Sequence, residues 1–336
     1  MTSTLQPPDG LEPVSQISPR IQSAVAAREV LGHDFFGGWQ PSDVDLFARH
    51  HHASEGAPGF VTDYFGVRTA SHFVPWAASN DGLVFVDPPV PDDGVRAEAI
   101  EYFALLDALE KSSPSNFSMI ELGASYAPWA CMAGVLAMRQ RKSSVRVRAV
   151  EASRYFFDLI QANYAANRLQ SEGSVVVTAT AVHAAVGIKR GTAFFPVVRS
   201  AFENGGQVTD TKVNVDYVGR AVEHEEVTLC TLDDVFEGFD VIDLLHCDIQ
   251  GAEADVLTYG AALLSQRVKH MFIGTHSRYI EGSMVDCFHK QGWLLERERP
   301  CAFSHQPSLT SPVGMTTRDG GQYWTNLRFA SNRERQ

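Results

Sequence analysis

Three acidic residues and one histidine each follow a run of apolar residues, where a strand is expected to end. They are Glu121, Glu151, Asp248 and His276. A carboxylate accepts hydrogen bonds or binds a cation, and a neutral imidazole accepts a proton near neutral pH. In an open parallel sheet, ligands bind beyond the carboxyl ends of the strands. The pattern therefore predicts that these four side chains share one site.

The turn after Glu121 has small residues but lacks the signature of a phosphate-binding loop. Gly123 is its one glycine, and Ala124 and Ser125 are small enough for a ligand to approach the backbone. Neither G-x-G-x-x-G nor Gly-Lys-Ser/Thr occurs here. This disfavours a P-loop NTPase and disfavours binding of the pyrophosphate of a dinucleotide.

Glu151 ends the second strand, the position at which an acid can accept hydrogen bonds from the two hydroxyls of a ribose. NAD, FAD and S-adenosylmethionine (SAM) all carry such a diol, but SAM has no phosphate. Residues 121–125 are expected to line its methionine portion, with Ala152 beside the ribose-binding acid. An alternative is that Glu121 and Glu151 are helix-start acids stabilised by the helix dipole.

Asp248 and His276 end two strands that, if adjacent, would lie about 4.8 Å apart. A buried carboxylate is costly unless it is paired. We expect His276 to be the base that removes a proton from a hydroxyl, with Asp248 orienting His276 or the molecule that carries the hydroxyl. Asp248 is also expected to contact the cofactor. A divalent cation such as Mg²⁺ between Asp248 and His276 is a further prediction. The alternative is a histidine whose nitrogens bind backbone carbonyls.

Four more residues border the same predicted edge. His183 follows the third strand and is expected beside an adenine ring. Tyr126, Trp129 and Arg278 are expected to contact the molecule that carries the hydroxyl.

Apolar strands that alternate with helices must position these residues. This alternation predicts an α/β fold with a parallel sheet covered on both faces, and an antiparallel strand at the end, where no long helix intervenes. Helices are expected over 18–31, 41–52 and 97–111. The expected strands cover 117–122, 145–150, 175–180, 227–230, 241–247, 268–274, 293–296 and 323–329.

Composition narrows the class of partner. The 336 residues are 44% hydrophobic and carry a formal net charge of −12, which disfavours nucleic acid and anionic membranes. No apolar run approaches the length of a membrane span. The five cysteines form no C-x-x-C pair, and the N-terminus does not resemble a signal peptide. We therefore expect a cytoplasmic protein with reduced thiols.

Five blocks together make the chain resemble the FkbM-type SAM-dependent methyltransferases. They are ELGA (121–124), VEA (150–152), AAVG (184–187), TLDD (231–234) and CDIQGAEADVL (247–257). Three features depart from the family pattern: Gly123 is the one glycine of the first loop, His246 and Cys247 replace a common lysine, and Gln250 stands where glutamate is common.

The resemblance implies a Rossmann-like, seven-stranded class I methyltransferase sheet, mostly parallel with the last strand antiparallel. It implies that residues 113–336 form the methyltransferase domain, while residues 1–112 form a mostly helical or irregular N-terminal cap. It also implies methyl transfer from SAM to a hydroxyl of a sugar or natural product, so that the partner is a small-molecule or glycan acceptor.

Two other functions stay open from the sequence. One is a non-catalytic binding protein on a methyltransferase scaffold, and the other is a nicotinamide-dependent reductase that uses Glu151 for its ribose. Assembly into a homo-oligomer is also left open.

Overall fold

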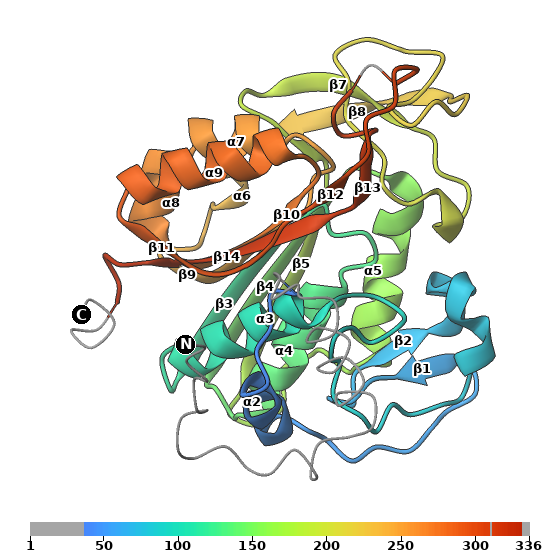
Figure 1. Cartoon of the computed structure of the whole chain (residues 1–336). Coiled ribbons are helices and arrows are strands. Elements are labelled where there is room, and N and C mark those ends of the chain that lie inside the picture. The colour runs from blue at the N-terminus through green and yellow to red at the C-terminus, as the bar shows by residue number, and fades with distance from the viewer. Residues whose placement is uncertain (1–36, 310, 331–336) are drawn as a thin grey trace, which may run out of the picture.

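The computed structural model describes residues 37–309 and 311–330 and is built around one seven-stranded sheet (Figure 1). The strand order is β11-β14-β10-β9-β3-β4-β5. The strands are β3 (Asn116–Leu122), β4 (Ser144–Glu151), β5 (Val176–His183), β9 (Ile242–Cys247), β10 (Val268–Thr275), β11 (Trp293–Arg299) and β14 (Gly320–Asn326). The helix predicted over 18–31 lies outside the described residues.

The sheet confirms the predicted fold class. Strands β3, β4, β5, β9 and β10 pair in parallel, and β14 pairs antiparallel with both β10 and β11. The central strands β3 and β9 are buried along nearly their whole length, as their continuous apolar runs require. Strands β9 and β10 are neighbours, so the turns that follow them meet at one edge.

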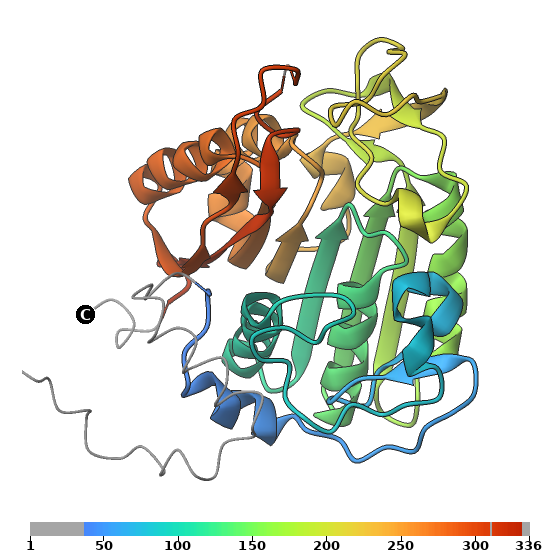
Figure 2. The ribbon, with the colours of Figure 1, turned by 45° about the vertical axis from the view of Figure 1, so that its right-hand side comes forward.

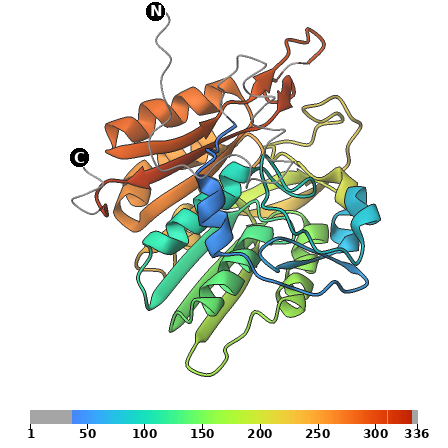
Figure 3. The ribbon, with the colours of Figure 1, turned by 60° about the horizontal axis from the view of Figure 1, so that its bottom comes forward.

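Helices cover both faces of the sheet, as Figures 1 and 3 show. On one face, α3 (Ala99–Lys111), α4 (Pro128–Arg139) and α5 (Arg154–Ala166) contribute to one apolar cluster with the strands. On the other face, α6 (Leu232–Val235), α7 (Glu253–Tyr259), α8 (Ala261–Arg267) and α9 (Arg278–Lys290) contribute to a second cluster.

A small second sheet lies above the carboxyl ends of the strands, where β3, β4 and β5 point in Figure 2. It contains β6 (Ala185–Val186), β7 (Gly191–Pro196) and β8 (His224–Cys230), in the order β6-β8-β7. The strand predicted over 227–230 therefore exists, but it does not belong to the main sheet. Its partner β7 was not predicted. The short 3₁₀ helix η4 (Ala201–Glu203) lies in the connection between β7 and β8.

The chain before the sheet contains α2 (Asp43–Arg49), the two-stranded pair β1 (Phe60–Thr62) and β2 (Arg68–Ala70), and the 3₁₀ helices η2 (Ser71–Phe73) and η3 (Pro75–Asn80). The last element of this segment, α3, packs directly on β9, β10 and β14. One apolar cluster includes residues on both sides of residue 112. The division of the chain at 112 stays a prediction, but the two parts share a core.

The remaining two strands, β12 (Ala302–Phe303) and β13 (Thr316–Arg318), pair with each other. All five cysteines are free thiols. Among the described residues, the helices are too short or too polar to cross a bilayer.

Candidate active site

A cavity of about 1210 Å³, partly open to solvent, lies at the carboxyl ends of β3, β4 and β9. Most residues predicted for the site line it: Glu121, Gly123, Ala124, Ser125, Tyr126, Trp129, Glu151, Ala152 and Asp248.

The loop after β3 holds an unusual backbone conformation. Gly123 has φ +71°, and a Cβ at this position would lie 1.7 Å from the backbone oxygen of Asp248. Ser125 and Ala127 also have positive φ, at 49° and 59°. A left-handed conformation costs a non-glycine residue about 1–2 kcal/mol. Positive φ recurs at every second residue of this loop. Of the three positions, Gly123 is the one where the backbone that follows β9 comes too close for a side chain.

Glu121 serves the helix that begins next to it. Its two carboxylate oxygens accept hydrogen bonds from the backbone N–H groups of Ala130 (2.7 Å) and Trp129 (3.3 Å), at the start of α4. Burial raises the pKa of Glu121 to about 8 despite these bonds, and the charges of Glu151 and Asp248 add to the increase. The helix-start interpretation therefore applies to Glu121, which also faces the cavity.

Glu151 joins the loop after β3 to the start of α5. It accepts hydrogen bonds from the N–H of Ser125 at 2.7 Å and of Ser153 at 2.6 Å. Burial raises its pKa to about 7, against the effect of these bonds. Each carboxylate oxygen has a further lone pair, so a hydroxyl in the cavity can still be bound.

His276 is enclosed by two carboxylates. Its Nδ1 lies 2.9 Å from Oε1 of Glu253, and its Nε2 lies 3.2 Å from Oδ1 of Asp248. Burial lowers the pKa of His276, but the charges of Glu253 and Asp248 outweigh this and raise it well above its usual value. Burial also raises the pKa of Asp248, but His276 outweighs it and makes the net shift negative.

This environment does not favour the predicted role of His276 as the base. An imidazolium between two carboxylates has no lone pair with which to accept a proton. His276 is also not among the residues that line the cavity, whereas the Asp248 side chain is 44% exposed and lines it. The geometry favours a positioning role, in which His276 holds Asp248 toward the cavity. The alternative prediction, that the ring nitrogens of His276 bind backbone carbonyls, is wrong, because both nitrogens face carboxylates.

The predicted Mg²⁺ site fits this arrangement poorly. Ligand atoms of Asp248, Glu253 and His276 lie within 4.8 Å of one another. However, the two carboxylates are paired with opposite nitrogens of the ring, so these contacts would have to break before all three residues could face one ion. Glu253 also accepts hydrogen bonds from the N–H groups of Ile249 and Gly251. Mg²⁺ also prefers oxygen ligands, whereas His276 offers a ring nitrogen.

Two other predicted residues lie away from the cavity lining. Nε2 of His183 is 3.1 Å from the carbonyl oxygen of Ala152, and the ring packs on Phe157. The lining near β5 comes instead from Ala184, Ala185 and Val186. The Arg278 side chain is 65% exposed and lies 3.8 Å from Glu281 on its own helix.

Tyr126 and Trp129 do line the cavity, as predicted. Tyr126 packs against Phe73 of the N-terminal segment, and Trp129 packs edge-on against Tyr102 of α3. The part of the cavity lined by Tyr126 and Trp129 is therefore in contact with the N-terminal segment.

The lining residues that sequence reasoning missed include Trp76, Arg96 and Glu101 from the N-terminal segment, and His246 from β9. The first three lie outside the resembling blocks, and no local motif marks them. His246 carried a signal, because it departs from the family pattern at a position two residues before Asp248.

Comparisons with known proteins support these observations. The family model "Methyltransferase FkbM domain" matches residues 121–291. A protein of Jannaschia sp. (strain CCS1), named "Putative methyltransferase", is 29% identical over 252 residues, covering 74% of this chain and 87% of the relative.

Solved structures of low sequence identity also align with the chain. A precorrin-6y C5,15-methyltransferase from Geobacter metallireducens GS-15 aligns with a TM-score of 0.37 and 11% identity, over 68% of this chain and 87% of that one. A ribosomal protein L11 methylase from Lactobacillus delbrueckii subsp. bulgaricus aligns with a TM-score of 0.32 and 10% identity, over 73% and 86%.

Proposed function

The chain belongs to the FkbM methyltransferase family and is a SAM-dependent methyltransferase, and from this premise we propose that it methylates a hydroxyl of a sugar or natural-product acceptor. When bound, SAM supplies an activated methyl group. The residues of the chain have to align the acceptor with that group, exclude water and take up a proton.

One observation carries the proposal: the cavity lining includes side chains beyond those that SAM requires. We assign these to a second, acceptor end, which contains the aromatic side chains of Trp76, Tyr126 and Trp129 and the polar side chains of Glu101 and His246. Aromatic rings provide an apolar surface, while carboxylate and imidazole groups accept hydrogen bonds from hydroxyls. This combination suits a ring that bears hydroxyl groups.

The first end of the cavity has the groups that SAM needs. We assign the ribose hydroxyls to Glu151 and the methionine portion to the loop of Gly123, Ala124 and Ser125. Ala152 and Ala184 offer an apolar wall for the adenine. The carboxylates at this end suit a ligand that carries a positive charge.

Asp248 lines the cavity directly after β9, and we assign it to the region between the two ends. Held by His276, its carboxylate is placed to orient the acceptor. This assignment gives His276 and Asp248 linked positioning roles.

The first test is calorimetric titration of the purified full chain with S-adenosylhomocysteine, with and without Mg²⁺. We expect saturable binding that Mg²⁺ does not change, because the Asp248–His276 pair fits an ion poorly. A Glu151→Gln variant should bind at least tenfold more weakly, since a charge-assisted hydrogen bond contributes about 1.5–3 kcal/mol. An exposed control, Glu172→Gln, should bind like the unaltered chain.

The second test supplies SAM with a deuterated methyl group and a panel of monosaccharides, oligosaccharides, polyphenols and primary amines. A labelled methyl ether identified by mass spectrometry would support the proposal, while a labelled amine would contradict it. Binding of S-adenosylhomocysteine without any methylated product would favour the non-catalytic alternative. Family membership decides against the nicotinamide-dependent reductase. A homo-oligomer stays a prediction that light scattering can check.

A further inference from the structure

Two buried side chains in the second end of the cavity form a pair that the proposed alignment of substrates does not use. Nε2 of His246 lies 3.1 Å from Oε2 of Glu101. The His246 side chain is 5% exposed and that of Glu101 is 14% exposed, and both residues line the cavity. Glu101 comes from α3 and His246 from β9, 145 residues apart along the chain.

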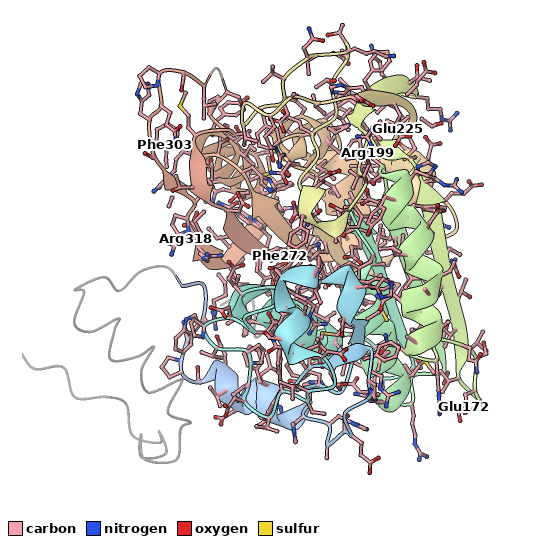
Figure 4. The ribbon with its side chains drawn as sticks, turned by 90° about the vertical axis from the view of Figure 1, so that its right-hand side faces the viewer. Glu172, Arg199, Glu225, Phe272, Phe303 and Arg318 are labelled. Carbon is pink, nitrogen blue, oxygen red and sulfur yellow. The ribbon has the colours of Figure 1, made fainter. Side chains whose placement is uncertain are left out.

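The second ring nitrogen of His246 is unsatisfied. Nδ1 is buried and has no hydrogen-bond partner. The ring is held between the rings of Trp129 and Phe272, which stack on it at centroid distances of 5.4 and 4.9 Å. Phe272, labelled in Figure 4, lies near the middle of the molecule, behind the N-terminal segment. A buried polar atom without a partner is costly, so this nitrogen calls for a ligand.

The pair lies close to the groups already assigned. His246 is directly opposite Glu121 in the pairing of β3 with β9. It is two residues before Asp248, so both side chains belong to the same face of the sheet. Because His246 and Glu101 both line the cavity, we assign the unsatisfied nitrogen to its acceptor end.

We propose that Glu101 and His246 act as a proton-accepting pair, in which Nδ1 of His246 takes the proton of the acceptor hydroxyl and Nε2 passes its own proton to Glu101. This inference rests on the proposed methylation of a hydroxyl. It replaces His276 as the predicted base with a histidine that has a nitrogen available.

The proton balance is consistent with this pair. The O–H bond of the acceptor is exchanged for an O–CH₃ bond, and the electron pair of the broken C–S bond stays on sulfur. The pair gains one proton and changes from net charge −1 to 0, while the sulfonium charge disappears. The gain of one positive charge by the pair offsets the loss of the sulfonium charge, so the total charge in the cavity does not change.

Burial favours the neutral form of both partners. It lowers the pKa of His246 to about 4 and raises the pKa of Glu101 well above its usual value, with Glu98 and Asp248 adding to the increase. The other charged groups that act on Glu101 are Arg299 and Asp93. In the ligand-free protein this favours the protonated form of Glu101, so the bound SAM cation has to favour its ionised form before the pair can accept a proton from the hydroxyl.

A proton count tests this without knowledge of the acceptor. Calorimetry in two buffers of different ionisation enthalpy gives the protons released when SAM or S-adenosylhomocysteine binds. Because SAM carries one more positive charge than S-adenosylhomocysteine, we expect the protein to release more protons when it binds SAM. In the Glu101→Gln and His246→Phe variants, the difference between the two proton counts should be smaller by up to one proton. His270→Phe is the matched control, since His270 is also buried and lies on the adjacent strand, but outside the cavity lining.

Nitrogen NMR of the imidazole rings gives a second readout. In the SAM complex we expect His246 to carry its proton on Nε2 and to have an unprotonated Nδ1. A proton on Nδ1 in that complex, or an unchanged proton count in both variants, would overturn the inference.

Turnover then separates this inference from the proposed function. With whichever acceptor of the panel is methylated, kcat should fall about 10²-fold or more in His246→Phe, with the affinity for S-adenosylhomocysteine within about threefold. Unchanged kcat would refute the pair while leaving the function intact. If no hydroxyl is methylated but the proton count still depends on Glu101, the acceptor class is wrong and the protonation of the pair still holds.

Discussion

The two faces of the central strands differ at their carboxyl ends. On the face toward α3 and α4, β3 presents Glu121 and β9 presents His246, directly opposite each other. On the face toward α6–α9, the next residues are Leu122 and Cys247, which are also opposite each other and belong to an apolar cluster. A shift of one residue along each strand thus exchanges a polar pair for an apolar one.

This difference shows how one sheet combines stability with chemistry. Burying apolar side chains contributes roughly 1.5–3 kcal/mol for each. Burying a carboxyl or an imidazole opposes folding unless the group is neutral or well paired. Burial raises the pKa of Glu121 and lowers that of His246, as this cost requires. Both faces contribute apolar clusters to the core, but at the carboxyl ends of β3 and β9 the face toward α3 and α4 presents the ionisable groups.

The largest expected effect is on the apolar face. Leu245 precedes His246 in β9 and is fully buried in the cluster with α6–α9. Leu245→Ala should lower the free energy of unfolding by about 2–5 kcal/mol, because it removes packed methyl groups and leaves a cavity. Urea denaturation measures this. At a temperature where the variant is folded, its affinity for S-adenosylhomocysteine should be unchanged; a tenfold loss would show that the faces are not independent.

The polar face should make the stability of the ligand-free protein depend on pH. Glu121 has a pKa of about 8 in the folded chain and an ordinary value of 4.5. Between these values the native state holds a proton that the unfolded state has released, so stability falls as pH rises. For this one group, the loss between pH 6 and 7.5 is at most about 2 kcal/mol.

Urea denaturation across that range measures the slope. Glu121→Gln should flatten it, whereas Glu172→Gln should not, because Glu172 is exposed at the lower end of the molecule in Figure 4. Equal slopes in Glu121→Gln and the unaltered chain would contradict the prediction.

The smallest effect concerns the loop that follows the polar face. Ser125 has φ 49°, so Ser125→Gly should stabilise the protein by about 0.5–1 kcal/mol through relief of the left-handed conformation. Ser153 is the control, since it has φ −70° and its side chain accepts a hydrogen bond from the N–H of Phe156. Ser153→Gly should destabilise by a few tenths of a kcal/mol. Thermal unfolding compares the two, and a shared sign would refute the explanation.

The sequence was informative about the sheet because its signals are local. Continuous apolar runs indicated the buried parallel strands, and the acids at their ends indicated the cavity. The pattern could not separate the strand over 227–230 from the main sheet, because the alternation within one strand does not identify the strand with which it pairs. It also could not show that Arg278 and His183 lie outside the cavity lining, since a position after a strand does not fix a side-chain direction.

The site was less predictable where it depends on contacts between distant residues. Asp248 and His276 were paired correctly, because neighbouring strands bring their turns together. The sequence did not predict Glu253 on the other side of the ring, and this contact changes the role of His276. Glu101 had no signal at all, because its importance comes from the way α3 packs on β9.

The packing of α3 has a consequence for how this enzyme can be inherited and exchanged. The family match begins at residue 121, yet Glu101 enters the cavity from a helix that ends at Lys111. A recombination event that moved only the matched region into another gene would transfer the SAM end of the cavity without its partner wall. Natural exchange between relatives should therefore preserve a unit that starts before Ala99, and specificity for the acceptor should travel with that helix.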